Sequence, residues 1–126
     1  MNSIESIFKL LSEPKRLLIW IMLMEDTYCV CDIERFLHLK QANVSRHLEW
    51  FRTRELVTMK RNFKWVHYSL SSDALKKHKA LCDYIRQSSL YHQIILKLDN
   101  FEKDACIPKT QKAREKGEAY ESKTNY

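Results

Sequence analysis

Two cysteines separated by a single residue, Cys29 and Cys31, are the side chains of this sequence with the clearest chemistry. Thiolates are soft ligands that select soft, thiophilic ions. Trivalent arsenic and antimony favour three sulfur ligands by the same reasoning. The pair therefore indicates a site for a soft metal or metalloid. Two small core hydrophobes are the alternative interpretation, because free cysteine is often buried.

Two further cysteines are candidates for a third sulfur ligand. Cys106 is the first, because it lies beyond the last predicted helix and the cost of closing a long loop grows only slowly with its length. Cys82 is the second, although its position in an apolar helical stripe favours packing. The metal-ligand candidates are therefore Cys29, Cys31 and Cys106. An idle Cys106, with the other two thiols as the whole site, is the alternative that stays open.

The elements that position these thiols are predicted to be mainly α-helical with one small β-hairpin. The chain of 126 residues contains a single glycine, Gly117, which argues against a Gly-rich phosphate loop and against a sheet-rich protein. Apolar residues recur at helical spacing in five segments, whereas residues 57–60 and 65–70 alternate as strands do. The predicted helices cover about residues 3–11, 14–26, 29–37, 41–54 and 73–98.

Composition predicts one domain followed by a tail. Residues 1–102 are expected to form the folded domain, and residues 103–126, polar with few aliphatic side chains, a flexible tail. No stretch approaches the roughly 20 apolar residues that span a bilayer, and no signal peptide is recognised, which predicts a cytoplasmic protein without a membrane partner. In a reducing cytosol the cysteines are expected to be thiols or ligands rather than a disulfide framework.

Two short helices, a break, a longer helix and a hairpin predict a winged helix-turn-helix, whose second helix enters the major groove of DNA. The net charge of +6 agrees with an anionic partner. Polar residues on that helix and at the hairpin tip are suited to contact bases and phosphates. A solvated helix face and an ordinary turn are the alternative. The candidate DNA-binding residues are Gln41, Asn43, Ser45, Arg46 and His47 on the helix and Arg61, Asn62 and Lys64 at the tip.

Several stretches of the chain resemble the ArsR/SmtB family of metal-responsive repressors. They are Leu10–Leu17, Ser45–Leu48 and Lys64–Leu70. The run Cys29-Val30-Cys31-Asp32 is similar to the metal box of the arsenical-resistance operon repressors in that family. The resemblance covers about residues 4–106.

This resemblance implies a homodimer that binds double-stranded palindromic operator DNA and is released by arsenite or antimonite, without a catalytic cofactor. The first helix and the 73–98 helix would form the dimer interface. Two positions depart from the family pattern. Lys40 replaces a small polar residue at the start of the recognition helix, and lysine is a poor helix cap. Glu34 replaces a further cysteine of many arsenical relatives, and Cys106 is the first substitute for it.

The spacing of the two thiols suggests how a ligand could act on DNA binding. Residues two apart in a regular helix point about 200° away from each other. If Cys29 and Cys31 both lie in the first turn of the 29–37 helix, they can share one ion only when that turn distorts. Because this helix precedes the recognition helix, the ligand would favour a state poorly matched to DNA. Asp32 is not a soft ligand and is assigned to capping or charge balance.

Other functions are compatible with parts of the sequence. A thiol-based redox or persulfide sensor of the same fold would pair Cys29 with a distant partner such as Cys106, and a DNA-architectural module would need no ligand. A zinc site among His78, Cys82 and His92 is disfavoured, because the acidic-x-histidine pattern of the family's zinc sensors is missing. No enzyme is expected, since the sequence contains no recognisable nucleophile–base layout.

Overall fold

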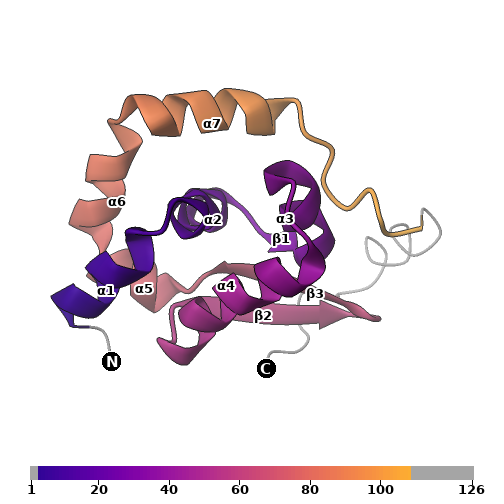
Figure 1. The fold of residues 1–126 in the computed structure, drawn as a ribbon, viewed down its shortest axis with the longest axis horizontal. Helices are drawn as coiled ribbons and strands as arrows, with labels where there is room; N and C mark the ends of the chain where they lie inside the picture. Colours follow the sequence, from indigo (N-terminus) through magenta and orange to yellow (C-terminus); the bar gives the residue numbers. More distant parts are fainter. Residues whose placement is uncertain (1–2, 109–126) are drawn as a thin grey trace.

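The computed structural model describes residues 3–108 and combines short helices with a small antiparallel sheet. Figure 1 shows one helix, residues 14–25, in the middle of the molecule, with two helices arching over one side and the sheet on the other. This arrangement of helices and hairpin confirms the predicted winged helix-turn-helix fold. The elements are α1 (Ile4–Leu11), α2 (Pro14–Glu25), β1 (Tyr28–Cys29), α3 (Val30–Leu37), α4 (Gln41–Thr53), β2 (Val57–Asn62), β3 (Trp65–Leu70), α5 (Ser72–Lys77), α6 (Lys79–Arg86) and α7 (Ser89–Asp99).

The hydrophobic core is built around α2. Every side chain from Ile19 to Met24 is buried, which is typical of a helix enclosed on all sides. Trp20 packs against Phe51 of α4 with ring centroids 6.3 Å apart, and α2 also contacts β3 and α7. α2 therefore fixes α4 and the sheet relative to each other.

A stack of two arginines and a tryptophan connects α1, α2 and α4. Arg16 is only 8% exposed, and its Nε donates to the carbonyl oxygen of Leu10 at 2.7 Å, at the end of α1. The Arg16 guanidinium lies 3.9 Å from the ring centroid of Trp50 in α4. Arg54 lies 4.4 Å from the same ring, and its Nε donates to Ser6 Oγ of α1 at 2.8 Å. These cation–π contacts and hydrogen bonds join three helices at one point.

The predicted hairpin is present as β2 and β3. The two strands pair in antiparallel register from Val57 opposite Leu70 to Asn62 opposite Trp65. The turn between them contains Phe63 with φ of 59°. In Figure 1 the hairpin lies below α4, and its free end extends past α3 to the right of the view.

The third strand of the sheet, β1, was not predicted from the sequence. Tyr28 pairs with Tyr68, and Cys29 pairs with His67 on β3. A strand of two residues is too short to produce an alternating pattern, so the sequence carried no signal for it. This pairing fixes Cys29 in extended backbone, outside the helix that follows.

The prediction of one helix over residues 73–98 is wrong, because three helices occupy this segment. The chain leaves helical geometry at His78, where φ is −110° and ψ is 31°. It breaks again at Ser88, whose Oγ accepts from the Tyr91 N–H at 3.1 Å and donates to the Ile85 carbonyl at 2.7 Å. Serine at an N-cap satisfies a free N–H and starts a new helix.

Within residues 3–108 no helix is long and apolar enough to cross a membrane.

The described structure continues past the predicted domain boundary at residue 102. Phe101 packs edge-on against Phe36 of α3 with ring centroids 5.2 Å apart. Arg35 of α3 donates to the carbonyl oxygen of Glu102 at 2.8 Å, and Ile107 is only 2% exposed. The C-terminal segment, residues 101–107, therefore folds back over α3, whereas the predicted tail beyond residue 108 lies outside the described residues.

Candidate metal centre and nucleic-acid interface

Four of the predicted DNA-contacting residues lie along the first two turns of α4. Gln41, Ser45 and Arg46 are exposed, and Asn43 is half-buried. Gln41 Nε2 donates to Ser45 Oγ at 3.1 Å, and Arg46 Nη2 donates to Asn43 Oδ1 at 2.9 Å. These hydrogen bonds hold amide and guanidinium groups, of the kinds that can pair with adenine and guanine edges, at the start of the predicted recognition helix.

His47 differs from these four residues. Its side chain is only 14% exposed, and its Nε2 lies 3.9 Å from Glu13 Oε1 at the start of α2. Burial lowers the pKa of His47, despite the opposing effect of Glu13. The structure directs this imidazole toward α2, so His47 is separated from the exposed α4 face that was predicted to include it. Lys40 is the N-cap of α4 and makes no capping hydrogen bond through its side chain.

The hairpin tip separates its three predicted DNA contacts in a similar way. Arg61 and Lys64 are exposed, with the Lys64 Nζ 5.2 Å from the ring centroid of Trp65. Asn62 is only 9% exposed, and its Nδ2 has no hydrogen-bond acceptor among the described residues. Asn62 thus occupies an interior position at the end of β2, and two cations remain at the surface of the tip.

The structure brings Cys106 to Cys31, 75 residues away in sequence. The two cysteines form a disulfide, with Cα atoms 6.6 Å apart, where the sequence predicted free thiols or ligands. Cys31 is half-buried in the first turn of α3, and Cys106 is exposed. The fold-back of residues 101–107 over α3 is the physical reason that these sulfur atoms meet.

Cys29 lies immediately before α3. It is the N-cap residue of that helix, with φ of −84° and ψ of 168°, and is 1% exposed. Burial is the main cause that raises the pKa of the Cys29 thiol to about 12. The expectation that both thiols lie within the helical turn is therefore wrong, because β1 takes Cys29 out of the helix. Binding of a soft ion to Cys29 would displace the thiol proton.

Cys29 and Cys31 line one cavity that extends to the elements predicted to contact DNA. The cavity has a volume of about 350 Å³. Its walls come from the start of α3, from the exposed start of α4 and from the hairpin, so a change in the thiols acts on a space shared with the recognition helix. Its lining residues are Cys29, Val30, Cys31, Glu34, Gln41, Ser45, Lys64, Trp65, Val66 and Tyr68.

Asp32 ties these parts together from a fully buried position. Its carboxylate accepts from the Cys29 N–H at 3.3 Å, from Arg35 Nη2 at 2.8 Å and from the Asp104 N–H at 2.8 Å. The first bond caps α3, which confirms the capping role assigned to Asp32. The third bond anchors the C-terminal segment. One buried carboxylate therefore holds the backbone on both sides of the thiols.

Replacing Asp32 with alanine is expected to lower the free energy of unfolding by about 3 kcal/mol, because the buried Cys29 N–H, the partly buried Asp104 N–H and the Arg35 guanidinium lose their acceptor. Urea denaturation followed by circular dichroism measures this loss. Glu34→Ala, in the same helix and half-buried, is the matched control and should change stability little. Equal losses in the two variants would contradict the role of Asp32.

Two residues that the fold brings to Cys29 were not predicted from the sequence. These residues are His67, which is 3% exposed, and Asp104. One potential ligand atom from each of Cys29, His67 and Asp104 lies within 4.8 Å of the other two. His67 Nε2 lies 2.9 Å from Asp104 Oδ1. The strand register of Cys29 with His67 was the missing signal, since β1 was not predicted. By contrast, His78 packs edge-on against Trp20 with ring centroids 6.0 Å apart.

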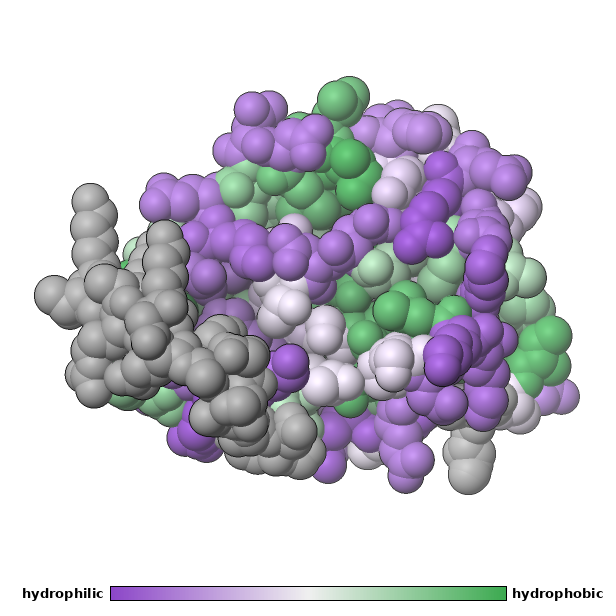
Figure 2. Space-filling model, turned by 180° about the vertical axis from the view of Figure 1, so that it is seen from behind, coloured by the Kyte–Doolittle hydropathy of each residue, from purple (hydrophilic) through white to green (hydrophobic). Residues whose placement is uncertain are grey.

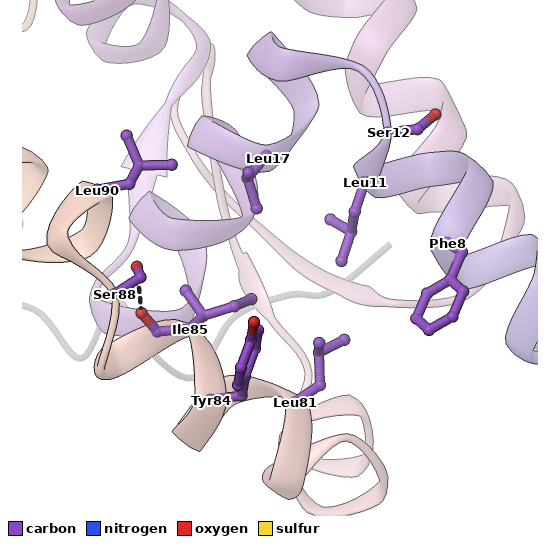
Figure 3. A pocket seen from close by; sticks show the side chains of 9 residues that line it. All are labelled: Phe8, Leu11, Ser12, Leu17, Leu81, Tyr84, Ile85, Ser88 and Leu90. Atoms are coloured by element: carbon purple, nitrogen blue, oxygen red, sulfur yellow. Dashed lines mark hydrogen bonds between the residues drawn. The ribbon is translucent and has the colours of Figure 1, made fainter.

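An apolar surface lies away from the DNA-reading elements, over α1 and α6. Ile4 is 65% exposed, Phe8 58% and Tyr84 73%. Figure 2 shows hydrophobic side chains interrupting the hydrophilic cover of this molecule. In Figure 3, side chains from α1 and α2 face those of α6 across a groove of about 360 Å³. The groove is lined by Phe8, Leu11, Ser12, Leu17, Leu81, Tyr84, Ile85, Ser88 and Leu90.

Together, α3, α4 and the hairpin define a winged helix-turn-helix protein with cysteines beside its recognition helix. The family described as "Bacterial regulatory protein, arsR family" matches residues 13–58. An arsenical resistance operon repressor from Staphylococcus xylosus is 30% identical over 114 residues, which are 90% of this chain and 96% of that relative. The chain therefore belongs to the arsR family of bacterial regulatory proteins. This membership confirms the resemblance and the expectation that the protein is not an enzyme.

Two other similarities extend this result. An arsenical resistance operon repressor from Escherichia coli K12 is 41% identical over 66 residues, which are 52% of this chain and 56% of that relative. The structure of reduced HlyU from Vibrio cholerae N16961 is 28% identical with a TM-score of 0.60, covering 67% of this chain and 85% of HlyU. The chain spans little more than half the length of the E. coli relative. Because HlyU is not named for a metalloid, the similarities identify the family but not the inducer.

Proposed function

We propose that this protein is a transcriptional repressor that binds operator DNA as a homodimer and is released by trivalent arsenic or antimony. One observation carries the proposal: the fold brings Cys106 to Cys31. Cys31 lies in α3, two residues after Cys29, and α3 directly precedes the recognition helix α4. Two relatives named as arsenical resistance operon repressors support the same ligand class.

The donor set fits a trivalent metalloid. Arsenite prefers soft thiolates, and in the reduced protein Cys31 and Cys106 supply two sulfurs at one place. Cys29 lines the same cavity as Cys31 and supplies the third. Cys29 is an extended N-cap residue, whereas Cys31 is helical. An ion bound by both thiolates would therefore change the backbone geometry where β1 meets α3.

This change in backbone geometry would lead to release of DNA. The cavity that the two cysteines line is also walled by Gln41 and Ser45 of α4 and by Lys64 of the hairpin. A ligand that draws the start of α3 inward changes the position of α4 relative to the hairpin. The metalloid then binds one arrangement more tightly than the DNA-bound one, which is the differential affinity that allostery requires.

The homodimer is supported by the apolar groove between α1 and α6. Phe8 and Tyr84 line this groove and are largely exposed, and Ile4 of α1 exposes a further apolar side chain. Patches of this kind mark protein–protein contacts. The residues that line the groove come from α1, α2 and the segment of α6 and α7, and none comes from α4 or the hairpin. A second copy can therefore cover the groove without covering the recognition helices. Two-fold symmetry of the dimer would match an inverted-repeat operator.

A second candidate function is sensing of thiol oxidation. The disulfide between Cys31 and Cys106 carries this alternative. It differs from the pairing of Cys29 with Cys106 that the sequence suggested, and it leaves Cys29 as a buried free thiol. Formation of the bond would remove two electrons and two protons from the thiols, passing them to an oxidant or a persulfide donor.

A DNA-release titration tests the proposal. The reduced protein is bound to a labelled inverted-repeat duplex, and fluorescence anisotropy follows release by arsenite, antimonite, cadmium, lead and zinc. Release by arsenite and antimonite at the lowest concentrations supports the metalloid function. Release only after addition of an oxidant or persulfide favours the second candidate. Unchanged DNA affinity in every arm contradicts both.

A further inference from the structure

We propose that Cys29, His67 and Asp104 form a second metal site, which takes a divalent ion of the zinc class. These side chains come from β1, from β3 and from the C-terminal segment. One thiolate, one imidazole and one carboxylate are a ligand set that suits Zn²⁺ and leaves one tetrahedral position open. This site goes beyond the metalloid function, because its only sulfur is Cys29.

The geometry of the three donors is close to that of a bound ion. Their potential ligand atoms all lie within 4.8 Å of one another, and His67 Nε2 is 2.9 Å from Asp104 Oδ1. Ligand atoms around a tetrahedral zinc ion are about 3.5 Å apart. A small closure of Cys29 toward the other two groups is therefore enough to complete the site.

The surroundings hold the ligands in place. The register of β1 with β3 sets Cys29 directly opposite His67. The carboxylate of Asp32 accepts from the N–H groups of both Cys29 and Asp104, so one buried group orients the backbone of two ligands. Hydrogen bonds of this kind, outside the ligands themselves, position metal sites.

Charge and burial also favour a divalent cation. Cys29 is 1% exposed and His67 3%, whereas the Asp104 side chain is 27% exposed and offers a route of entry. A divalent ion bound by one thiolate and one carboxylate gives a neutral centre. Binding forms the metal–sulfur bond and releases the thiol proton to water. The ion would clamp the hairpin strand β3 to the start of α3.

The two sites share Cys29 but differ in what oxidation does to them. The disulfide removes Cys31 and Cys106 from the three-thiol set and leaves Cys29 free. The zinc-class site therefore persists in the oxidised protein, in which the three-thiol site is absent.

Cobalt binding to the full chain tests this site, with Co²⁺ as the spectroscopic probe. The background is Cys31→Ser/Cys106→Ser, which leaves Cys29 and the distant Cys82 as the only thiols. We expect one Co²⁺ per chain, with visible bands of a tetrahedral ion and a thiolate charge-transfer band. His67→Gln and Asp104→Asn should each weaken binding at least about 10-fold. His78→Gln and Glu102→Gln are the matched controls.

Retained affinity in both His67→Gln and Asp104→Asn would overturn the site, as would a charge-transfer band that disappears with Cys82→Ser. If His67→Gln fails to fold, as judged by circular dichroism, Asp104→Asn decides alone, because this side chain is partly exposed. The background lacks two of the three metalloid thiols. Failure of cobalt binding therefore leaves the metalloid proposal intact, and loss of arsenite-induced release in the wild type leaves the cobalt result intact.

Discussion

Replacing Cys31 with serine is expected to leave operator binding intact and to abolish release at the arsenite concentrations that release the wild type. Serine keeps the size of the side chain but is a poor ligand for a soft ion. Cys31 does not lie on the exposed face of α4, so DNA affinity should stay within about two-fold of the wild type. The arsenite concentration needed for half-release should rise at least about 100-fold, since loss of supporting contacts alone costs about 10–100-fold. Anisotropy titrations under reducing conditions measure both quantities.

Two other single variants show which thiols bind the arsenic. Cys106→Ser should lower the sulfur coordination number of bound arsenic from three to two, as measured by X-ray absorption, and weaken binding. Cys82→Ser, at a buried position in α6, is the matched control and should respond as the wild type does. Full arsenite-induced release by a Cys29→Ser/Cys31→Ser protein would show that these thiols are not the sensor. Unchanged coordination in Cys106→Ser would leave Cys29 and Cys31 as the whole site.

Replacing Arg46 with alanine is expected to reduce discrimination between operator and random DNA by about 1–3 kcal/mol, or roughly 5- to 150-fold. Arg46 is exposed near the start of α4, and its guanidinium donates to Asn43. The substitution removes a candidate base contact and frees Asn43 from its partner. Affinity for random DNA should fall less, because phosphate contacts from the hairpin cations remain. Competition titrations at fixed salt measure the ratio.

Arg52→Ala is the control for Arg46→Ala. Arg52 lies in the last turn of the same helix, is half-exposed and pairs with Glu49. The Arg52→Ala substitution removes the same charge from α4 as Arg46→Ala does, and it leaves the start of the helix unchanged. A matching loss of discrimination in both variants would attribute the effect to net charge and would contradict base reading by Arg46. A steep salt dependence of both proteins is expected in either case.

The elements that carry strong periodic patterns could be predicted from the sequence, and the short or interrupted ones could not. The hairpin was predicted because alternation over Trp65–Leu70 is long enough to be distinctive. The 73–98 segment keeps an apolar stripe through its breaks, so periodicity alone suggested one helix. The serine pair Ser88-Ser89 was the available sign of a new helix start, since serine is a favoured N-cap.

The candidate site divides along similar lines. Cys29, Cys31 and Cys106 were identified by residue type, because few side chains other than thiols are soft ligands. Which thiols meet depends on the fold-back of residues 101–107, and this rests on contacts of Phe101 and Arg35 between distant segments. The role of His67 depends on a two-residue strand. Pairings of this kind are tertiary, so single-sequence patterns do not contain them.

The Arg16–Trp50–Arg54 stack would give the proposed dimer a mechanical property. Arg16 donates a hydrogen bond to the end of α1, and Arg54 donates one to Ser6 within α1. Both guanidinium groups also lie over the Trp50 indole of α4. These contacts couple α1 to the recognition helix α4, so the two helices are expected to move together as one lever. In a dimer built on α1 and α6, any tilt at the subunit contact would change the span between the two reading helices. The spacing of the half-sites on the operator would then be measured by the protein through this lever.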